Sequence, residues 1–574
     1  MPSRQLPPPE KTFSVTVWFQ RPPDCPLRVE ILIENDNTWM RSWNVYCEPE
    51  DPAAQWITER GVLENMNDPA SYELALRCIR ECASNHPRCS PAAHAKLPTR
   101  VIDCSDPDRP RLFITEGAPD GYYVALSYVW GEDQPNRTTR GRLPSYLHGI
   151  EAQRIPKTIR DAIQGTHSLG LRYLWVDAFC IIQDSDEDKA AEIATIRTIF
   201  RCAYLTIIAA NAKKVSEGFL DCMFIHNSPS TLPFRCPDGG IGTIYAQSRS
   251  DTPPQPINTR AWCLEERILS TRALWYCTPT LQYECQTAHV NVDGNPNMSK
   301  PRDGIPRLPN YIFTPKLPTI PKMTPEEAEE QADQAWQSIL RLYTRRDLTK
   351  PRDRLLALSG VVEYFHTFWN KSSYLAGLWK HQLPGCLLWR VECGDPEPRP
   401  TYRAPSWSWA AVDGEISSQM VTYSGAVCAV KTCYAEPKSH VNPYGEVMEG
   451  VLQLDVIIRR VVWDPVECEL FEVDGQPAGV QDDYRSDRGE IGFVTVDAAE
   501  EVSSLKCEVT AAVLVQNSTL LHGILLVPTP LDIPTPKEGL SEVTGTYRRI
   551  GTFTTSFCDR EVWLGTQRQV VTIV

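Results

Sequence analysis

The stretch LRYLWVDAFCIIQDSDEDKAAEIATIRTIFRCAYLTIIAA, which occupies residues 171–210, contains two kinds of apolar periodicity. Arg172–Asp177 and Leu205–Ala210 are short apolar runs, and such runs predict buried strands. Between them, Asp186–Ala203 has apolar residues three and four positions apart, which predicts an amphipathic helix. Strands that alternate with helices in this way are typical of a layered α/β fold whose sheet is largely parallel.

The same alternation begins further upstream. Tyr123–Tyr128 predicts another buried strand, and Pro156–His167 predicts the helix that follows it. The acidic residues Asp186–Asp188 lie where the next helix should begin, and we expect them to favour its positive N-terminal end. These elements together predict an α/β domain over residues 116–285.

The residues before this domain predict a separate lobe. Residues 11–45 alternate apolar and polar positions, which is typical of strands, with a hairpin turn at the segment RPPDCP. Between Pro69 and Cys82 the spacing becomes helical. We therefore expect an N-terminal α+β lobe over residues 1–115.

The residues after the α/β domain predict three further regions. Residues 286–323 are rich in proline and lack periodicity, which indicates a linker. Thr324 can cap a helix that should run to about Tyr343, within a helical or mixed region over residues 324–450. Short β-branched segments then predict an antiparallel, β-rich region over residues 451–574.

The composition excludes several classes of protein. A chain of 574 residues predicts two or three packed units, and a net charge of −14 disfavours nucleic acid as a partner. No segment is apolar and long enough for a signal peptide or a membrane span, so we expect a cytoplasmic protein without a membrane partner. Most of the twenty cysteines, including Cys180, Cys202 and Cys263, are expected to be reduced and buried.

Polar and aromatic residues follow the predicted strands, where open α/β sheets place their sites. The block VALSYVWGED brings Ser127, Tyr128, Trp130 and Gly131 to the end of one strand, and Asp177 ends another. A carboxylate directly after an apolar strand needs a partner or a ligand, so Asp177 is the preferred polar site residue. The alternatives are structural, because Trp130 can fill the core and Asp177 can bind loop amides.

A third block, NTRAWCLEERILSTRALWYC, predicts a helix that carries charged and aromatic residues. Trp262 and Glu266 are four positions apart and therefore share a face, with Arg260 close by. An aromatic surface beside a carboxylate is a candidate site, although the same pattern is common in surface ion pairs. No P-loop, GxGxxG, HExxH or CxxC motif is present.

One group of residues has the chemistry of zinc ligands. Cys78, Cys82, His86 and Cys89 are close in sequence, but their spacing does not match a common zinc finger. Cys78 and Cys82 also share one helical face, which favours buried packing. The sequence therefore predicts no metal site.

The three blocks together resemble the heterokaryon-incompatibility (HET) domain of filamentous fungi. The family's ALSYxWG strand is similar to Ala125–Gly131, and its LPxTIxDA helix to Ile155–Ala162. Its LW(I/V)DALCI(N/I)QD segment is similar to Leu174–Asp184, and its R(A/G)WxxQE segment to Arg260–Glu266. Glu265 departs from the family pattern, which has glutamine there and therefore one charge fewer.

The resemblance implies a role in nonself recognition, in which the mixed compartment of fused hyphae is killed. It also implies a TIR-like, flavodoxin-like fold, a class that includes NAD-cleaving enzymes, although fold is a weak warrant for chemistry. On this hypothesis NAD is a substrate and no cofactor is required. Glu266 would hold the ribose, Asp177 would support it, and Trp130 or Trp262 would stack on the base. The wider binding set comprises Ser127, Tyr128, Trp130, Gly131, Arg260 and Trp262.

A second hypothesis is that the domain is a non-enzymatic switch. Exposed carboxylates and tryptophans equally suit binding to partner proteins, because tryptophan is enriched at interface hot spots. Death would then follow from assembly with incompatibility partners or from self-association.

Overall fold

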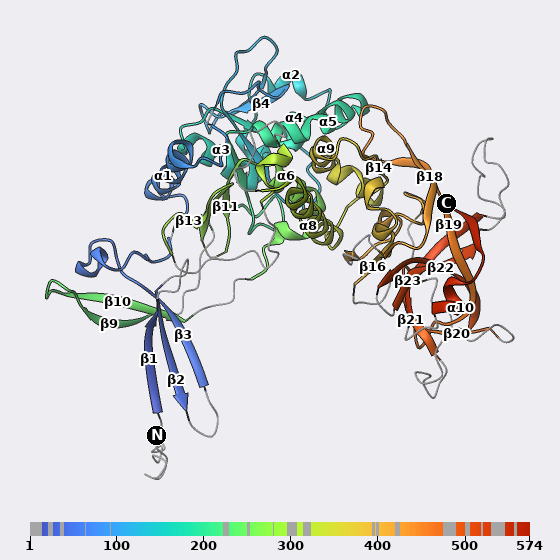
Figure 1. The fold of residues 1–574 in the computed structure, drawn as a ribbon. Helices are drawn as coiled ribbons and strands as arrows, with labels where there is room; N and C mark the ends of the chain where they lie inside the picture. Colours follow the sequence, from blue (N-terminus) through green and yellow to red (C-terminus); the bar gives the residue numbers. More distant parts are fainter. Residues whose placement is uncertain are drawn as a thin grey trace, which may run out of the picture. The chain divides into compact units, whose positions relative to one another are not determined.

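The computed structural model describes most of the chain, and the described residues form two compact units. The first unit comprises residues 1–258 and 269–304, and the second comprises residues 259–268 and 305–574. Figure 1 shows the elements of each. The described residues are 14–20, 27–34, 39–63, 65–91, 93–221, 229–248, 253–278, 280–295, 307–313, 323–392, 397, 401–418, 425–473, 490–499, 505–517, 520–529, 546–555 and 560–574.

The first unit contains a five-stranded antiparallel sheet. The predicted N-terminal strands are present, and β1 pairs with β2 as the predicted hairpin requires. A small core that includes Val29, Val45 and Ile244 packs against this sheet. In sheet order the strands are β1 (Ser14–Gln20), β2 (Arg28–Glu34), β3 (Trp39–Tyr46), β10 (Ile241–Ser248) and β9 (Ser230–Arg235).

The central sheet of the first unit has eight strands and is mixed. In sheet order they are β13 (His289–Asn291), β12 (Leu281–Cys285), β11 (Arg272–Tyr276), β8 (Leu205–Ile208), β6 (Tyr123–Ser127), β7 (Tyr173–Trp175), β4 (Arg100–Asp103) and β5 (Arg111–Ile114). The four middle strands, β11, β8, β6 and β7, are parallel to one another. The edge strands pair antiparallel, so the predicted largely parallel sheet is corrected to a mixed one.

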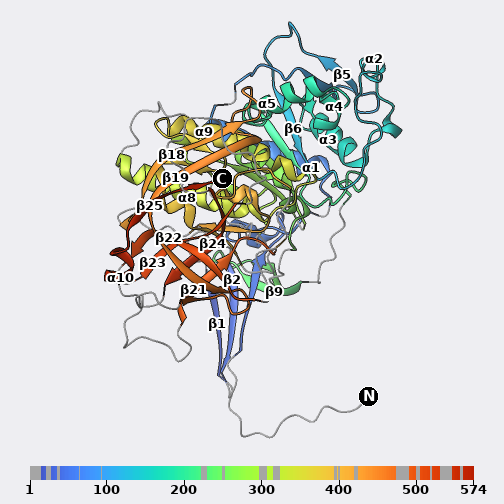
Figure 2. The same cartoon turned by 90° about the vertical axis from the view of Figure 1, so that its right-hand side faces the viewer.

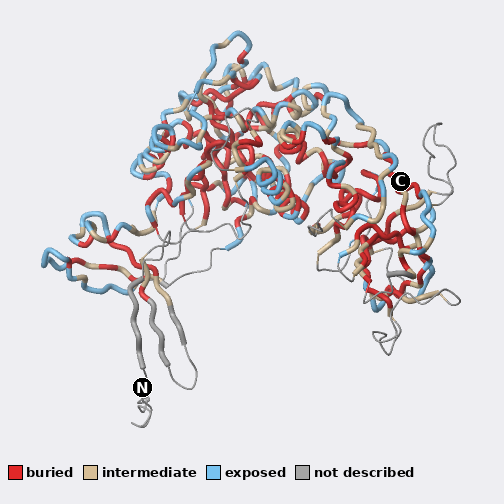
Figure 3. The backbone as a smooth tube through the Cα atoms, in the orientation of Figure 1, coloured by how far each residue is buried: buried red, intermediate tan, exposed pale blue. Residues whose placement is uncertain are grey.

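Helices cover both faces of this sheet, which confirms the predicted layered α/β arrangement. Trp175 and Thr206 point to one face, where Phe200 packs on Trp175 with ring centroids 5.8 Å apart. Ile207 points to the other face, where a Cβ added at Gly165 would lie 3.6 Å from its Cδ1. The sheet therefore runs, deeply buried, between two helical layers (Figure 3). The helices are α1 (Pro69–Asn85), α2 (Leu143–Tyr146), α3 (Lys157–Ser168), α4 (Asp177–Cys180) and α5 (Asp186–Cys202).

The start of α5 confirms the predicted role of its acidic residues. Asp186, Glu187 and Asp188 fill the first turn, and the Ser185 side chain accepts a hydrogen bond from the Asp188 amide. Asp188 also pairs with Arg100 of β4, with 2.6 Å between the guanidinium nitrogen and the carboxylate. This ion pair therefore also connects the start of α5 to β4, the strand next to the edge strand β5.

Two short strands were not predicted. β4 and β5 lie within residues 1–115, yet they belong to the central sheet rather than to a separate lobe. β4 pairs antiparallel with β7, about 70 residues further along the chain, and no local pattern in the sequence indicates such a pairing. The predicted linker over residues 286–323 likewise contains β13 and the short helix α7 (Asn310–Phe313).

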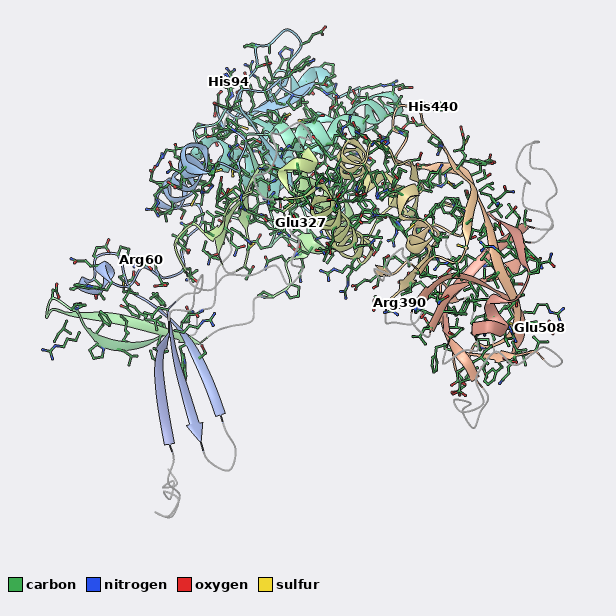
Figure 4. The ribbon with its side chains drawn as sticks, in the orientation of Figure 1. Arg60, His94, Glu327, Arg390, His440 and Glu508 are labelled. Carbon is green, nitrogen blue, oxygen red and sulfur yellow. The ribbon has the colours of Figure 1, made fainter. Side chains whose placement is uncertain are left out.

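The second unit begins its helical part with the predicted cap. The Thr324 side chain accepts a hydrogen bond from the Glu327 amide, and the Glu327 carboxylate accepts one from the Thr324 amide. Glu327 is labelled in Figure 4. This capping box starts α8 (Pro325–Thr344), which ends one residue beyond the predicted Tyr343. The helical part also contains α6 (Ala261–Leu269), α9 (Ser359–Phe368) and the two-stranded pairs β14 (Tyr374–Leu375) with β15 (Leu378–Trp379) and β16 (Trp389–Val391) with β17 (Ile416–Ser418).

The C-terminal part of the second unit is the predicted antiparallel β region. Its main sheet closes on itself, because the long strand β19 pairs with β20 and also with β22 (Figure 2). Apolar residues such as Trp463, Leu525 and Phe553 fill its core. The elements are β18 (Ala429–Pro437), β19 (Val447–Asp464), β20 (Glu469–Glu472), β21 (Glu490–Val496), β22 (Cys507–Asn517), β23 (Leu520–Pro528), β24 (Thr546–Thr555), α10 (Arg560–Leu564) and β25 (Arg568–Ile573).

Two predictions about the whole chain can be compared with the described residues. Every described cysteine is a free thiol, and Cys180 and Cys263 are buried as predicted. Cys202, at the last position of α5, is exposed, so the prediction of burial is wrong for this residue. In the described part of the chain, no helix has the length and apolar character that a bilayer crossing requires.

Candidate functional site

The candidate site lies at the carboxyl ends of β6 and β7, the two neighbouring parallel strands at the middle of the central sheet. β6 ends at Ser127, and Tyr128 and Trp130 follow it directly. β7 ends at Trp175, and Asp177 is the first residue of α4. Because parallel neighbours end at the same edge, the topology brings these side chains together.

The carboxylate of Asp177 is held by two aromatic side chains. The Tyr128 hydroxyl donates a hydrogen bond of 2.9 Å to Oδ1, and the Trp130 indole Nε1 donates one of 2.9 Å to Oδ2. The Ala178 amide donates a third, of 2.7 Å, to Oδ1. Gln134 Nε2 donates to the Tyr128 oxygen at 3.0 Å and so fixes the orientation of the hydroxyl. The structure therefore brings together Trp130 and Asp177, two of the three residues predicted to converge.

This arrangement leaves Asp177 able to accept a ligand. A carboxylate offers about four lone-pair positions, and the described residues occupy two on Oδ1 and one on Oδ2. Tyr128 is buried, with 3% of its surface exposed, whereas Trp130 and Asp177 are half-buried. The structural alternatives hold only in part. Trp130 is half-buried and keeps one polar contact, and Asp177 accepts a hydrogen bond from the Ala178 amide of α4 rather than from a loop.

Cys180 lies one helical turn after Asp177 and is fully buried. Burial raises the pKa of its thiol to about 12, which outweighs the hydrogen bond that the Val176 amide donates to the sulfur. The thiol therefore stays protonated at neutral pH. Because the thiolate is the nucleophilic form, Cys180 is excluded as a nucleophile at this edge.

The loop that follows β8 is hydrogen-bonded to the turn that follows β6. The Val215 amide donates to the Trp130 carbonyl at 3.0 Å, and the Ser216 amide donates to the Glu132 carboxylate at 2.9 Å. The loop can approach this closely because Gly131 has no side chain and a φ of +65°. A Cβ at Gly131 would lie 2.3 Å from the Lys213 carbonyl oxygen. Ser127 lies below the turn, buried in the sheet.

Gly131→Ala is expected to destabilise the first unit. The left-handed backbone conformation alone costs an L-residue about 1–2 kcal/mol, and the contact with the Lys213 carbonyl adds to this cost. The matched control is Gly170→Ala, because Gly170 has a φ of +73° but open space around the added methyl. Thermal unfolding should show a larger loss for Gly131→Ala than for Gly170→Ala, and equal losses would contradict the close approach of the loop.

Two residues of this region were not singled out from sequence. Gln134 supports Tyr128, and Asp161 of α3 holds the loop after β8. Asp161 Oδ2 accepts hydrogen bonds from the amides of Phe219, at 2.7 Å, and Leu220, at 3.2 Å. The available signal was a carboxylate on the buried face of α3, where an unpaired charge would be costly.

The candidate site residues of the third predicted block lie within residues 259–268, which belong to the second unit. Trp262 contributes a side-chain hydrogen bond to Asp353, and the backbone of Arg260 pairs with that of Asp347 in an isolated parallel β-bridge. Glu266 is half-buried on α6. Convergence of Arg260, Trp262 and Glu266 with Asp177 stays a prediction.

Glu265, the position at which the sequence departs from the family pattern, has a structural role in this unit. It is buried, with 2% of its surface exposed. Its Oε2 accepts hydrogen bonds from the amides of Gly360, at 2.8 Å, and Val361, at 3.3 Å. These amides belong to the first turn of α9, where a negative charge complements the helix dipole.

Glu265→Ala is expected to destabilise the start of α9 by about 2 kcal/mol, since a hydrogen bond to a charged group contributes roughly 1.5–3 kcal/mol. Glu265→Gln keeps the acceptor oxygen and should lose less. Hydrogen exchange of the amides in residues 359–368 and urea unfolding of the full-length chain both measure the stability that each variant loses. Equal losses in the two variants would show that the oxygen acceptor contributes nothing.

Comparison with known proteins agrees with these blocks. The family model "Heterokaryon incompatibility protein (HET)" matches residues 123–266. A stretch of 103 residues is 29% identical to heterokaryon incompatibility protein 6, OR allele, of Neurospora crassa, and the match covers 16% of this chain and 14% of that protein. The chain thus spans about a seventh of this relative. No solved structure matches the chain significantly. Residues 123–266 are a heterokaryon-incompatibility (HET) domain.

Proposed function

We propose that this protein acts in heterokaryon incompatibility as an effector that cleaves NAD, with the ribose bound at the carboxyl ends of β6 and β7. The observation that carries the proposal is the carboxylate of Asp177, held by Tyr128 and Trp130 with an acceptor position left on Oδ2. The membership of residues 123–266 in the HET family supports the biological role.

The order of the parallel strands supports the proposed position of the site. Counted along the chain, β6, β7, β8 and β11 are the first to fourth parallel strands, and their order in the sheet is 2-1-3-4. This is the order of flavodoxin-like sheets, which bind ligands where the first and third strands diverge. That point lies between β6 and β8, so Tyr128 and Trp130 after β6 and the loop containing Val215 after β8 border it. Asp177 follows β7, on the other side of β6, and reaches Trp130 from there. The TIR-like fold proposed from the resemblance has the same kind of sheet.

The proposed reaction is hydrolysis of the bond between nicotinamide and ribose. The bond from ribose C1′ to the nicotinamide nitrogen breaks, and its electron pair leaves with nicotinamide. Water adds to C1′ and releases a proton, so the products are nicotinamide and ADP-ribose. Positive charge develops on the ribose as the bond breaks, and a fixed carboxylate stabilises that charge without rearranging.

Asp177, Trp130 and Glu266 would each have a separate role in this reaction. Oδ2 of Asp177 would accept a hydrogen bond from a ribose hydroxyl. The half-buried indole of Trp130 beside it would stack on the nicotinamide base. Glu266 would provide the second carboxylate near the ribose. In this proposal NAD is the substrate, and the protein needs no bound cofactor.

A second candidate function is an assembly switch without turnover. The five-stranded sheet of the first unit favours it, because β9 lies at its edge with mostly exposed residues. Leu232 in this strand is 39% exposed, and Ile241 of the neighbouring strand β10, which pairs with Arg235, is 73% exposed. An exposed edge strand can pair with another chain, which suits self-association or binding of an incompatibility partner.

Incubation of the purified full-length chain with NAD at high protein concentration distinguishes the two functions. The wild type is expected to release nicotinamide and ADP-ribose, and Glu266→Gln is expected to abolish both this turnover and cell killing while leaving the fold intact. Asp186→Asn is the matched control, because it removes one negative charge from a carboxylate that is 97% exposed. Oligomers without turnover in the wild type, or unchanged turnover in Glu266→Gln, would overturn the enzymatic proposal.

A further inference from the structure

Four metal-binding side chains meet at the end of α1, away from the carboxylate site. They are Cys82 in the last turn of α1, His86 directly after it, Cys89 in the following turn, and Cys285 at the end of β12. One ligand atom from each lies within 4.8 Å of all the others. Cys82 and Cys285 are buried, and the other two are half-buried. We propose that these four residues bind a structural zinc ion.

The distances within the cluster are those that a zinc ion requires. A tetrahedral ion with bonds of about 2.3 Å to sulfur holds its sulfur atoms about 3.8 Å apart, and nitrogen slightly closer. His86 Nδ1 lies 3.3 Å from Cys285 Sγ and 3.8 Å from Cys89 Sγ. Cys82 and Cys285 are in side-chain hydrogen-bond contact. The ligand atoms all lie within 4.8 Å of one another, so side-chain shifts of about 1 Å would bring them to the tetrahedral spacing.

The chemistry of the four ligands selects zinc. Three thiolates and one imidazole form a soft, tetrahedral ligand set, which suits zinc and disfavours magnesium or calcium. The Ala288 amide donates to Cys285 Sγ at 3.3 Å, and the Thr287 hydroxyl lies 3.4 Å from Cys89 Sγ. Such contacts hold and stabilise thiolate ligands. All four positions are filled by the protein, as in structural sites, whereas a catalytic zinc keeps one position open.

The zinc would connect two distant parts of the sequence. Cys285 follows His86 by 199 positions, and the ligand set would join the end of α1 to the turn between β12 and β13. It would therefore attach the segment before the HET domain to an edge of the central sheet. This separation explains why the spacing of Cys78, Cys82, His86 and Cys89 does not match a zinc finger. Cys78 lies one helical turn earlier and is outside the cluster.

Zinc content of the purified full-length chain tests the proposal. The protein is prepared without a metal-affinity tag, and its zinc is measured by mass spectrometry. We expect about one zinc ion per chain in the wild type and in Cys78→Ser, the matched control on the same helix. Cys285→Ser should lose most of the zinc. Replacement of zinc by cobalt should give the thiolate charge-transfer bands and the intense d–d bands of a tetrahedral site.

Two further readouts keep the test decisive if Cys285→Ser folds poorly. Zinc in the wild type should protect Cys82, Cys89 and Cys285 from alkylation, while Cys202, which is exposed, reacts. Folded wild-type protein that contains no zinc, or that contains a disulfide between Cys82 and Cys285, would overturn the proposal. Retention of zinc in Cys285→Ser would also overturn it. None of these outcomes depends on NAD turnover, so the proposed function and the zinc site can fail separately.

Discussion

Asp177→Asn is expected to lower kcat/KM for NAD by about 100-fold or more, because loss of one preorganised charge that stabilises a transition state typically costs a factor of about 10²–10³. The amide keeps the size of the side chain but removes the negative charge beside the ribose. One of its polar atoms also becomes a donor, which conflicts with the N–H of Trp130 or the O–H of Tyr128. The measurement is steady-state nicotinamide release. The control is Asp186→Asn, which makes the same change of net charge at an exposed position.

Graded variants separate the charge of Asp177 from its orientation. Trp130→Phe and Tyr128→Phe each remove one donor from the carboxylate and keep an aromatic ring. Both should therefore lower turnover less than Asp177→Asn does. Trp130→Phe should also raise KM, because a smaller ring stacks less well on the base. Turnover in Asp177→Asn equal to that of the wild type would contradict the assigned role.

Arg549→Met is expected to destabilise the second unit by about 3–5 kcal/mol, the usual cost of removing one partner from a buried ion pair. Arg549 and Asp497 have fully buried side chains, at 0% and 1% exposure, with their ion pair at 3.0 Å. The guanidinium also donates to the carbonyls of Leu387, at 2.7 Å, and Trp389, at 2.6 Å, so it connects β24 to the helical part. Hydrogen exchange in residues 546–555 and denaturant unfolding report the loss.

The control for this prediction is the double variant Arg549→Met with Asp497→Leu. Replacement of a whole buried ion pair by apolar side chains is often neutral, because neither charge is left unpaired. The double variant should therefore be more stable than Arg549→Met alone. If it is less stable, burial of the unpaired Asp497 carboxylate is not the main cost.

The sequence predicted the elements whose signal is local. The apolar period of residues 186–203 predicted α5, and the Thr324 cap predicted the start of α8. It could not predict that β4 and β5 join the central sheet, because the antiparallel pairing of β4 with β7 is a long-range contact that no local pattern indicates. The mixed character of the sheet has the same cause.

The candidate site was predictable in part for the same physical reason. Trp130 and Asp177 follow adjacent parallel strands, so their meeting needed only the alternation of strand and helix. Gln134 lies in a loop without a pattern, and its contact with Tyr128 depends on the path of that loop. Cys285 was not associated with His86, because a spacing of 199 residues carries no local signal.

The central claim is that ribose binds at the edge formed by Tyr128, Trp130 and Asp177. Hydrogen exchange of the full-length chain, with and without a saturating carbocyclic NAD analogue that cannot be hydrolysed, tests it most directly. The account predicts slower exchange in residues 127–134 and 177–183 of the wild type, and loss of this protection in Asp177→Asn. Protection confined to other segments, or unchanged exchange at this edge, would contradict it.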